Sequence, residues 1–527
     1  MSLRSKTGIL LFAAALLAAL PGSANTLDTA KLGAPPTDNW PSYNGDFSGR
    51  RYSTLNQINA DTVKSLIPAW TYTVTDAATS RGDAGVIKAT PLVVNGIMYL
   101  SVPDNVFAID ARTGKEIWRY GWMDKGGHLI GNRGIGMFQN MLYFMGPDDY
   151  VIALDSTTGK EIWRKQIADA RLNYYTNTAP IVIGNHLLIG VGGDAIDVQC
   201  FLLSLDPASG NTQWRWDVTP KKGEPGFETW PNAETAAHGG GCTWLPGTYD
   251  KDLGLLYWGT GNANPVYNGS GRPGANKWTA SIVALNIHSG KFVWGHSVSP
   301  HDTHDWDNVE TPVLVDATID GTPRKLLAQT ARNGYFTVLD RTNGKYLVAK
   351  PFVPLKWSLG IDKDGSPIPN PEFDPQIGGS LNISSATNWP PPSYSPKTGL
   401  FYVNANEANT VYYVTDLSPK PMGYSGVTHG AGRAKHFVKA LDVKTGNVKW
   451  QRDGGSGGLL STAGGLVFTG DGFGNFVAYR DSDGQPLWHD RQTTNVGNGP
   501  ITVMIDGKQW LFVGSGSKMY AYTLGAK

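Results

Sequence analysis

The stretch AIDARTGKEIW, Ala108–Trp118, decides the fold because close copies of it recur along the chain. The shared unit is Ala-x-Asp-x-x-(Thr/Ser)-Gly-x-x-x-Trp. Further copies are ALDSTTGKEIW (Ala153–Trp163), SLDPASGNTQW (Ser204–Trp214), ALNIHSGKFVW (Ala284–Trp294), ALDVKTGNVKW (Ala440–Trp450) and the degenerate AYRDSDGQPLW (Ala478–Trp488). Repetition of one short unit at long intervals is typical of solenoids and propellers, in which each unit buries its apolar face against the next.

Each copy predicts a β-hairpin. A short apolar run precedes the Asp, as in NVFAI before Asp110, and such a run indicates a strand. The Asp-x-x-Thr-Gly segment predicts a tight turn in which the Gly takes a positive φ. The following KEIW predicts the returning strand, and its Trp can bury a large area against the neighbouring unit.

The spacing of the repeats predicts the architecture. The Trp-to-Trp intervals run from roughly 40 to 100 residues, which suits four-stranded propeller blades that carry insertions. One further copy, VLDRTNGKYLV (Val338–Val348), has lost its Trp, and LIPAWTYTV places Trp70 in another strand-like run. We therefore predict an all-β fold, an eight-bladed β-propeller with tryptophan-docking repeats, formed by residues 25–527 as a single domain.

The N-terminus predicts export. Residues 1–24 read as a signal peptide, with Arg4 and Lys6 before the apolar run Gly8–Leu20 and small residues up to Ala24. We expect cleavage after Ala24, a periplasmic protein and no membrane anchor, because no Cys for lipid attachment and no long apolar run follow. The net charge is +1 without a basic stripe, so no nucleic-acid partner is expected.

The chain contains two cysteines, Cys200 and Cys242. An oxidising compartment permits a disulfide between them, but the sequence leaves open whether they meet. No Cys-x-x-Cys-His is present, so no covalently attached haem is predicted. An electron-transfer enzyme of this sequence would pass its electrons to a separate partner.

Several motifs in order carry a family resemblance. They are NWPSYNGDFSGRRYSTLNQINADTVKSLIPAW (Asn39–Trp70), GGGCTWLPGTYD (Gly239–Asp250), SPHDTHDWD (Ser299–Asp307) and NWPPPSYSPKTGLFYV (Asn388–Val403). In these motifs the chain resembles the periplasmic quinoprotein alcohol dehydrogenases, which bind pyrroloquinoline quinone (PQQ) in an eight-bladed propeller. The resemblance implies oxidation of a small alcohol with PQQ and a metal ion, Ca²⁺ or a lanthanide, and a soluble periplasmic cytochrome c as electron acceptor. A monomer and a homodimer both stay open.

The resemblance assigns the catalytic and metal-binding residues. Asp305 matches the catalytic aspartate, a general base beside the metal. Arg332, in ARNG, matches the arginine beside the reactive quinone oxygens, where it can stabilise negative charge. Asn262, in GTGNANP, matches a metal-binding asparagine. Asp307 resembles the pattern of lanthanide-dependent members, since a trivalent ion favours an additional carboxylate; the alternative is an Asp307 turned to solvent.

The resemblance also assigns a cofactor pocket. Trp244 matches the indole that forms the floor under the PQQ ring, where stacking orients a planar cofactor. Arg133, in GNRG, matches an arginine suited to the PQQ carboxylates. The predicted cofactor-binding set is Arg133, Asn177, Gly192, Gly193, Cys242, Trp244, Arg332 and Asn388.

Three departures from the family pattern predict an outlying member. The adjacent cysteines found in many members are replaced by Gly127-His128, so the vicinal disulfide is absent. The family's metal-binding Glu aligns with Ala195, which is flanked by Asp194 and Asp197, and we prefer Asp194 as the ligand. Cys242 takes the place of a Thr that contacts the cofactor. The predicted metal ligands are therefore Asp194, Asn262, Asp305 and Asp307.

Two alternatives to catalysis remain. PQQ-type repeats also occur in propeller scaffolds that bind other proteins, and the departures could mark a degenerate quinoprotein that does not use the cofactor. Asn262, Asp305, Asp307, Arg332 and Trp244 favour the enzyme, because a scaffold has no need of them.

Overall fold

The computed structural model describes residues 26–74, 85–123, 126, 130–193, 197–319 and 321–525. The predicted signal peptide, Gly127-His128, Asp194 and Ala195 lie outside this range. No helix within it is long and apolar enough to cross a membrane.

The strands of the described residues form eight sheets of four or five strands and one sheet of two. The first three contain β3 (Leu92–Val94), β4 (Ile97–Val102), β5 (Asn105–Asp110) and β6 (Glu116–Gly121); β7 (Gly136–Phe138), β8 (Met141–Met145), β9 (Tyr150–Asp155) and β10 (Glu161–Gln166); and β11 (Ile181–Ile183), β12 (His186–Gly190), β13 (Phe201–Leu205) and β14 (Thr212–Asp217). The next two contain β15 (Thr248–Asp250), β16 (Leu255–Gly259), β17 (Ser281–Asn286) and β18 (Phe292–Ser297); and β19 (Val313–Ile319), β20 (Thr322–Thr330), β21 (Tyr335–Asp340) and β22 (Tyr346–Pro351).

Three more sheets follow, and the last two of them combine strands from both ends of the chain. They contain β25 (Ser380–Ile383), β26 (Ser393–Ser395), β27 (Leu400–Val414), β28 (Gly426–Asp442) and β29 (Val448–Asp453); β1 (Tyr52–Ser53), β30 (Ser456–Thr462), β31 (Leu466–Gly470), β32 (Asn475–Arg480) and β33 (Pro486–Arg491); and β2 (Leu66–Thr73), β34 (Ile501–Ile505), β35 (Lys508–Ser515) and β36 (Lys518–Leu524). The two-stranded sheet is β23 (Ser358–Ile361) with β24 (Pro367–Pro369). The helices are short: η1 (Thr29–Gly33), η2 (Val63–Ser65), η3 (Ala170–Leu172), η4 (Phe227–Thr229), α1 (Ala233–Ala237), η5 (Gly269–Gly271) and η6 (Pro371–Phe373).

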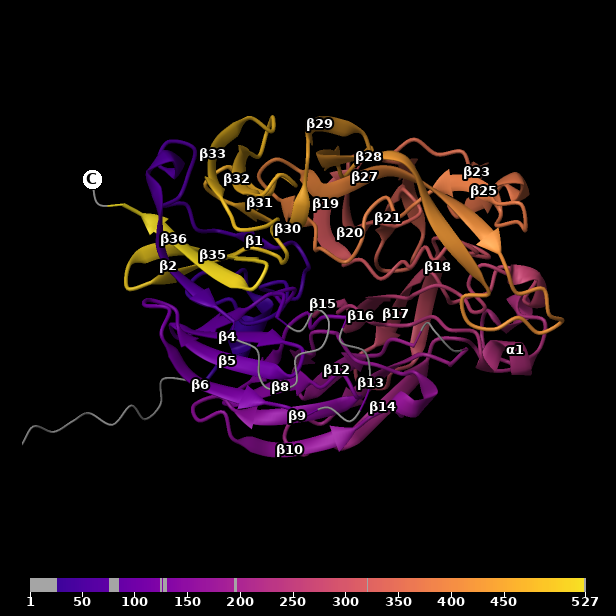
Figure 1. Cartoon of the computed structure of the whole chain (residues 1–527), viewed down its shortest axis with the longest axis horizontal. Coiled ribbons are helices and arrows are strands. Elements are labelled where there is room, and N and C mark those ends of the chain that lie inside the picture. Colours follow the sequence, from indigo (N-terminus) through magenta and orange to yellow (C-terminus); the bar gives the residue numbers. More distant parts are fainter. Residues whose placement is uncertain are drawn as a thin grey trace, which may run out of the picture.

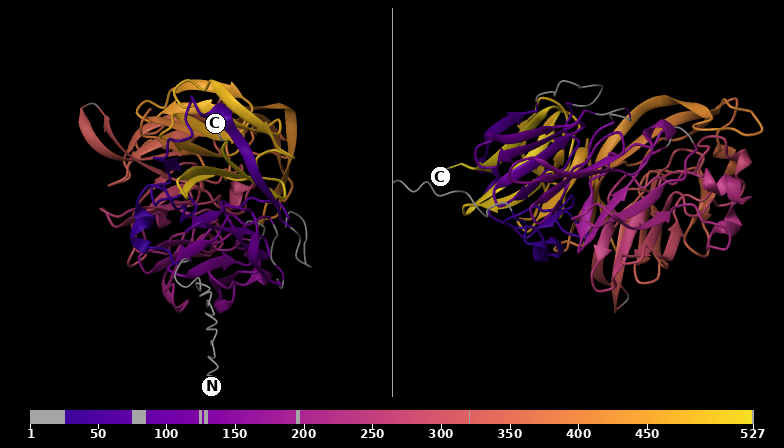
Figure 2. Two further views of the ribbon diagram at one scale, coloured as in Figure 1. Left: turned by 90° about the vertical axis from the view of Figure 1, so that its left-hand side faces the viewer. Right: turned by 90° about the horizontal axis from the view of Figure 1, so that it is seen from below.

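The sheets follow one another around the molecule in chain order, from indigo through magenta and orange to yellow (Figure 1). The circle closes where β2, near the N-terminus, pairs antiparallel with β36, the last strand. Figure 2 shows that β27 and β28 extend past their sheet toward α1. There Lys420, in the loop between these strands, lies 3.4 Å from Glu234 of α1.

The repeated unit forms the predicted hairpin in every copy. In the first copy Ala108 of β5 lies opposite Trp118 of β6, with a one-residue register shift before the turn. The same pairing of first and last residue joins Ala153 to Trp163, Ser204 to Trp214, Ala284 to Trp294, Val338 to Val348, Ala440 to Trp450 and Ala478 to Trp488. The hairpin prediction is confirmed because turn chemistry and strand pattern agree locally.

Except for Trp488, each repeat tryptophan lies against the turn glycine of the next repeat. Gly114 has a φ of +71°, as the turn requires, and a Cβ added there would lie 2.8 Å from the ring of Trp70. The same contact brings Trp118 to Gly159, Trp163 to Gly210, Trp214 to Gly290, Trp294 to Gly344 and Trp450 to Gly484. Where the Trp is lost, Val348 takes its place against Gly446. The glycine is thus needed for its backbone conformation and for the room it leaves to the indole.

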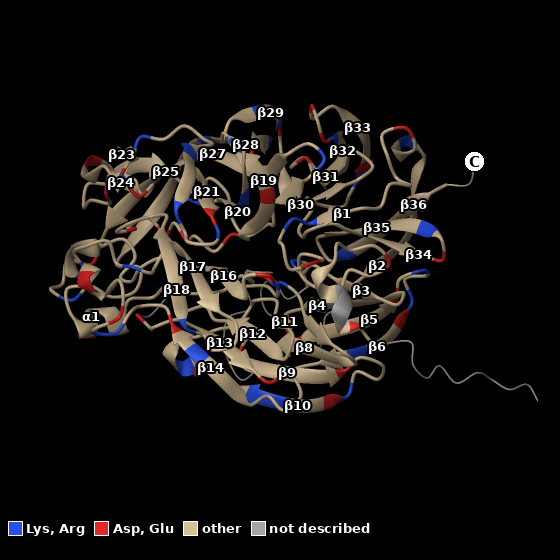
Figure 3. Cartoon of the chain, turned by 180° about the vertical axis from the view of Figure 1, so that it is seen from behind, with Lys and Arg blue, Asp and Glu red and all other residues tan. Residues whose placement is uncertain are grey.

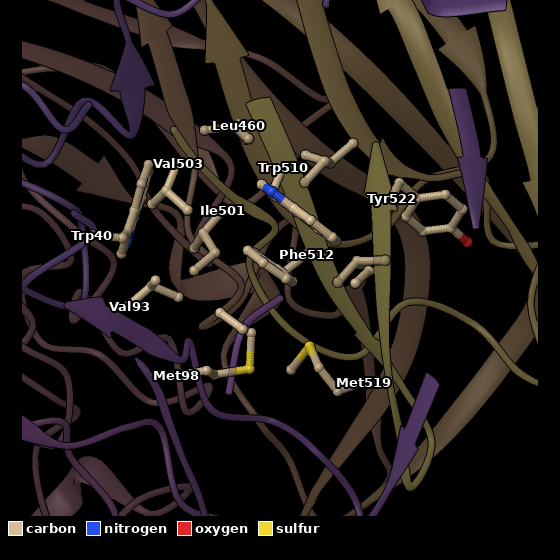
Figure 4. Close-up of a cluster of buried hydrophobic side chains, with 14 of the residues drawn as sticks. Trp40, Val93, Met98, Leu460, Ile501, Val503, Trp510, Phe512, Met519 and Tyr522 are labelled. Carbon is tan, nitrogen blue, oxygen red and sulfur yellow. The ribbon is translucent and has the colours of Figure 1, made fainter. Parts of the chain in front are cut away.

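A segment near the N-terminus, residues 40–53, ties the sheets together. Trp40 exchanges backbone hydrogen bonds with Val93, and the segment makes further backbone bonds to Tyr249, Leu314 and Tyr394 in three other sheets. Trp40 also joins a buried apolar cluster that includes residues of β3, β4, β30 and the last three strands (Figure 4). Figure 3 shows acidic and basic residues interspersed over the ribbon.

Candidate active site

The loop that carries Asp305 runs from β18 to β19 and is held by a buried carboxylate. Asp302 accepts hydrogen bonds from the backbone N–H groups of His304 at 3.1 Å and Trp306 at 3.0 Å. Burial raises the pKa of Asp302 to about 6. Between these two anchored residues Asp305 has a φ of +60°, a conformation that few side-chain-bearing residues adopt and that clusters at functional sites. Its side chain is 28% exposed and therefore accessible.

Asp307 accepts hydrogen bonds from two other predicted site residues. Its carboxylate is buried, with the whole residue 1% exposed. One oxygen accepts the backbone N–H of Asn262 at 2.6 Å, and the other accepts the indole N–H of Trp244 at 3.0 Å. The solvent-facing alternative for Asp307 is therefore excluded.

Arg332 lies next to both aspartates. Its Nη1 donates to the backbone carbonyl of Asp305 at 3.0 Å and lies 3.5 Å from the carboxylate of the same residue. Its Nη2 lies 3.1 Å from Asp307 and donates to the side-chain oxygen of Asn388 at 3.3 Å. The guanidinium is 5.5 Å from the ring centroid of Trp244. The structure thus brings together Asp305, Asp307, Arg332, Asn388 and Trp244.

Arg133 approaches Trp244 in a different setting. Its guanidinium carbon lies 5.6 Å from the centroid of Trp244 and 4.4 Å from that of Trp389. Nε and Nη1 are buried and have no hydrogen-bond partner within the described part of the chain. Burial lowers the pKa of Arg133 to about 10, so it stays protonated at neutral pH. A buried cationic donor without a partner is costly, which makes this position suited to an anionic ligand.

Asn177 extends the same unsatisfied region. Its backbone carbonyl accepts the N–H of Arg133 at 3.0 Å. Its side-chain oxygen is buried and lacks a hydrogen-bond partner among the residues described, as does the hydroxyl of the adjacent Thr178. Polar atoms of this kind are normally satisfied, so the ligand at Arg133 is expected to reach Asn177 as well.

The cysteines meet beside the predicted cofactor pocket. Cys200 and Cys242 form a disulfide with an S–S distance of 2.08 Å. Cys242 therefore presents no thiol, which corrects the simple replacement of a Thr hydroxyl by a Cys S–H. A Cβ added at Gly193 would lie 3.6 Å from the sulfur of Cys200, and Gly192 exchanges backbone hydrogen bonds with Tyr175. Because Gly192 and Gly193 have no side chain, the ring of Tyr175 and the disulfide can lie close to their backbone.

The predicted metal ligands are partly assembled. Asn262 donates its amide N–H₂ to the carbonyl of Ala263 and the side chain of Asn264, so its amide oxygen is the end suited to a cation. Together with Asp305 and Asp307 it offers the hard oxygen donors that Ca²⁺ and lanthanides favour. Within the described ranges, no three His, Cys, Asp or Glu side chains are grouped to hold a metal. The two carboxylates and the amide would thus need oxygen donors from the cofactor or from residues 194–196.

Asp197, the alternative to Asp194, is engaged elsewhere. One of its carboxylate oxygens accepts the backbone N–H of Gly423 at 2.9 Å, and its backbone carbonyl contacts the ring of His238 at 2.8 Å. The Asp197 carboxylate thus accepts a hydrogen bond from the loop between β27 and β28.

Sequence reasoning missed three groups near Asp305 and Arg332. Glu310 is 2% exposed, and burial raises its pKa to about 8. Tyr267 and Tyr412 are also buried, and their pKa values are raised by burial first and by the charge of Asp305 in addition. None of the three is marked by a local signal in the sequence, because their burial and their closeness to Asp305 and Arg332 arise only in the fold.

The polar centre and the surrounding repeats define a class: a β-propeller enzyme built to bind a planar anionic cofactor. Residues 40–141 and 165–354 match the family profile described as "Glucose/ethanol/alcohol dehydrogenase, beta-propeller domain". The chain belongs to this family of PQQ-dependent alcohol dehydrogenases. A shorter stretch, residues 434–525, matches the profile described as "Outer membrane protein assembly factor BamB".

Individual relatives agree over nearly the full length. A quinohemoprotein alcohol dehydrogenase of Comamonas testosteroni is 35% identical, with 93% of this chain and 74% of the relative covered. A 1-butanol dehydrogenase (cytochrome c) of Thauera butanivorans is 31% identical, covering 90% of this chain and 74% of that protein. The solved structure of a europium-containing methanol dehydrogenase superposes with a TM-score of 0.84 at 27% identity, covering 94% of this chain and all of that one (100%).

Proposed function

We propose that the protein oxidises alcohols with PQQ and a bound metal ion, and that the polar centre around Trp244 is its active site. The observation that carries this proposal is Arg133. It is a protonated guanidinium with two unpartnered nitrogens between two indole rings. PQQ is a flat tricarboxylate. Its carboxylates can accept hydrogen bonds from the Arg133 donors, and its plane can stack on the indole rings.

The residues around the pocket have separate tasks in this proposal. When bound, PQQ supplies the electron-pair acceptor for oxidation of the alcohol carbon. Trp244 provides the floor, and Arg133 pairs with a carboxylate. Asp305, which is accessible, accepts the hydroxyl proton as general base. Arg332 holds Asp305 through the contacts at 3.0 and 3.5 Å and stabilises negative charge on the far side of the reacting centre.

The cation would be held by Asp305, Asp307 and the amide oxygen of Asn262, with Asp194 as the predicted fourth ligand. The buried carboxylate of Asp307 favours a trivalent lanthanide over Ca²⁺, because the added negative charge suits the higher cation charge. The similarity to the europium-containing methanol dehydrogenase supports the same choice.

The aromatic surroundings of Asp305 suggest the kind of alcohol. The ring centroids of Tyr267 and Tyr412 lie 5.8 Å apart. The ring of Trp306 stacks on that of His304, with 4.1 Å between their centroids. A pocket wall of this composition favours substrates whose hydroxyl is attached to an apolar chain.

The finer architecture is part of the proposal. Residues 25–527 form one propeller domain of eight blades, in which each blade docks its Trp on the next. The eight sheets, the Trp–Gly contacts and the pairing of β2 with β36 support this arrangement. Residues 1–24 direct export to the periplasm, where a soluble cytochrome c accepts the electrons; the relative that is named with cytochrome c supports this acceptor. Sedimentation of the loaded protein distinguishes monomer from homodimer.

The test is dye-linked alcohol oxidation by purified apoprotein reconstituted with PQQ and either Ca²⁺ or La³⁺. We expect activity that depends on PQQ and is higher with La³⁺. Activity with Ca²⁺ alone would make Asp307 incidental to the choice of metal. No activity, together with no PQQ absorbance retained after desalting, would contradict the proposal and favour a scaffold or a degenerate quinoprotein.

A further inference from the structure

Three carboxylates surround the guanidinium of Arg332 rather than two. Asp305 and Asp307 face its two terminal nitrogens, at 3.5 and 3.1 Å. Glu310 faces the Nε edge instead, with one carboxylate oxygen 3.9 Å from Nε. Asp305 and Asp307 are the predicted cation ligands, and Glu310 belongs to no predicted ligand set.

Glu310 is buried without any other engagement of its carboxylate. The residue is 2% exposed, and neither carboxylate oxygen has a hydrogen-bond partner in the part of the chain that the structure describes. Its backbone carbonyl accepts from the side chain of Gln329, which fixes the main chain but not the acid. A buried acid with no hydrogen bonds costs stability, so its position next to Arg332 needs an explanation.

Metal binding supplies that explanation. Without a cation, Asp305 and Asp307 balance the charge of Arg332. A Ca²⁺ or lanthanide ion at the same two carboxylates would draw on this negative charge and would itself repel the guanidinium at short distance. Arg332 then requires a counter-charge that does not bind the cation. Glu310, on the Nε edge of the guanidinium, meets this requirement in its ionised form. It holds a proton in the cation-free protein and loses it when the cation draws Asp305 and Asp307 away from Arg332.

We propose that Glu310 is a positioning residue: in the metal-bound protein it is the counter-charge of Arg332, and it frees Asp305 and Asp307 to bind the metal ion. This inference rests on the proposed metal-dependent function. It predicts a larger effect for a trivalent than for a divalent ion, because the repulsion that Glu310 offsets grows with the charge of the cation.

The experiment measures metal affinity directly in the full-length, PQQ-loaded protein. Tb³⁺ is titrated by luminescence sensitised through nearby tryptophans, and Ca²⁺ by calorimetry. Glu310→Gln keeps the shape of the side chain and removes its charge. We expect it to weaken Tb³⁺ binding by about 10- to 100-fold and Ca²⁺ binding by a smaller factor. Glu310→Asp keeps the charge and should stay within about threefold of the wild type.

Two further variants separate this role from a general structural one. Glu407→Gln removes another acid paired with a buried base, since Glu407 lies 2.8 Å from Lys439 in the β27–β28 sheet. It should leave Tb³⁺ affinity unchanged. In an Arg332→Gln background no guanidinium competes for the aspartates, so adding Glu310→Gln should change Tb³⁺ affinity by less than about twofold.

The outcomes are distinct. Absence of Tb³⁺ and Ca²⁺ binding by the wild-type protein would overturn the proposed metal site and this inference together. Binding by the wild type with equal affinity in Glu310→Gln would overturn the inference alone. An undiminished effect of Glu310→Gln in the Arg332→Gln background would show that Glu310 acts on the cation and not through Arg332, which also overturns it. Should Glu310→Gln fail to fold, Glu310→Ala is titrated in its place, and a Tb³⁺ affinity within about threefold of the wild type would overturn the inference.

Discussion

The turns of the repeats and the polar centre are built in opposite ways. At most turns the indole has its partner: that of Trp118 lies on Gly159 and donates its N–H to the carbonyl of Ser156 at 3.1 Å. The indoles of Trp70, Trp214 and Trp450 donate to backbone carbonyls in the same way, whereas those of Trp163 and Trp294 have no partner among the described residues. At the centre, Arg133 and Glu310 are buried with polar atoms that have no hydrogen-bond partner among the described residues. The repeat therefore supplies the stability, and the segments that interrupt it supply binding sites at a cost in stability.

Substitutions in the two regions should therefore have different effects. A change at a turn should lower stability and leave the chemistry of the loaded protein intact. A change at the centre should alter binding or rate and leave the stability of the apoprotein equal or higher, because an unsatisfied group has been removed.

The largest effect is expected at Asp305. Asp305→Asn removes the proposed base while keeping the size of the side chain, and kcat should fall by roughly 10²- to 10⁴-fold. Dye-linked steady-state kinetics at saturating PQQ and metal measure the loss. The melting temperature of the apoprotein should not fall. A kcat within about threefold of the wild type would assign the base to another group.

A substitution of Arg133 tests whether its unpartnered donors bind an anion. Arg133→Met keeps a long apolar stem against Trp244 and Trp389, and PQQ binding should weaken by about 100-fold. Quenching of tryptophan fluorescence during a PQQ titration measures the affinity.

The matched control for this change is Arg215→Met. Arg215 also lies over an aromatic ring, 3.8 Å from the centroid of Phe201, but it is already paired with Asp217 at 2.7 Å. Arg215→Met should not affect the affinity for PQQ. Equal losses in both variants would mean that Arg133 contributes only to packing.

Glu310 gives a pH dependence of stability with a defined sign. Burial raises its pKa from 4.5 to about 8 in the folded protein, so the folded state holds this proton more tightly than the unfolded state does. The stabilisation is complete below pH 4.5 and is lost as pH rises through 8. Thermal unfolding of apoprotein from pH 5 to 8.5 should therefore show wild type losing roughly 4 kcal/mol relative to Glu310→Gln. Parallel curves for the two proteins would contradict the shifted pKa.

The smallest effect is expected at a repeat turn, that of Gly114, for which Gly399 in the turn between β26 and β27 is a matched control. Gly114 and Gly399 share a φ of +71°, but a Cβ at Gly114 would lie 2.8 Å from Trp70, whereas one at Gly399 has no atom within 4 Å. Both Ala variants carry the same backbone strain. Gly114→Ala should therefore be less stable than Gly399→Ala by about 1 kcal/mol. Chemical denaturation measures the difference, and kcat should be unchanged in both.

The sequence predicted the repeats well because their signals are local. A strand, an Asp-x-x-Thr-Gly turn and a second strand lie within eleven residues, and Ala108 pairs with Trp118 as this spacing requires. The contact of each Trp with the next turn was not visible in any single copy. It depends on how neighbouring units stack.

The site was predicted only where a motif marked it. Asp305, Arg332 and Trp244 meet in the structure, although they are far apart in the sequence. The disulfide between Cys200 and Cys242 depends on backbone placement, which spacing does not determine. Glu310 escaped because a single acid outside a motif has no meaning until its burial and its neighbour Arg332 are known.

The pairing of β2 with β36 has a consequence for the timing of synthesis. The sheet that begins at Leu66 cannot be completed until Leu524 has been made, because these two residues are partners in it. Contacts between such distant parts of a chain slow folding. The nascent chain would therefore hold an open structure until Leu524 has been made, and a chain that stays open can still be threaded through a narrow channel.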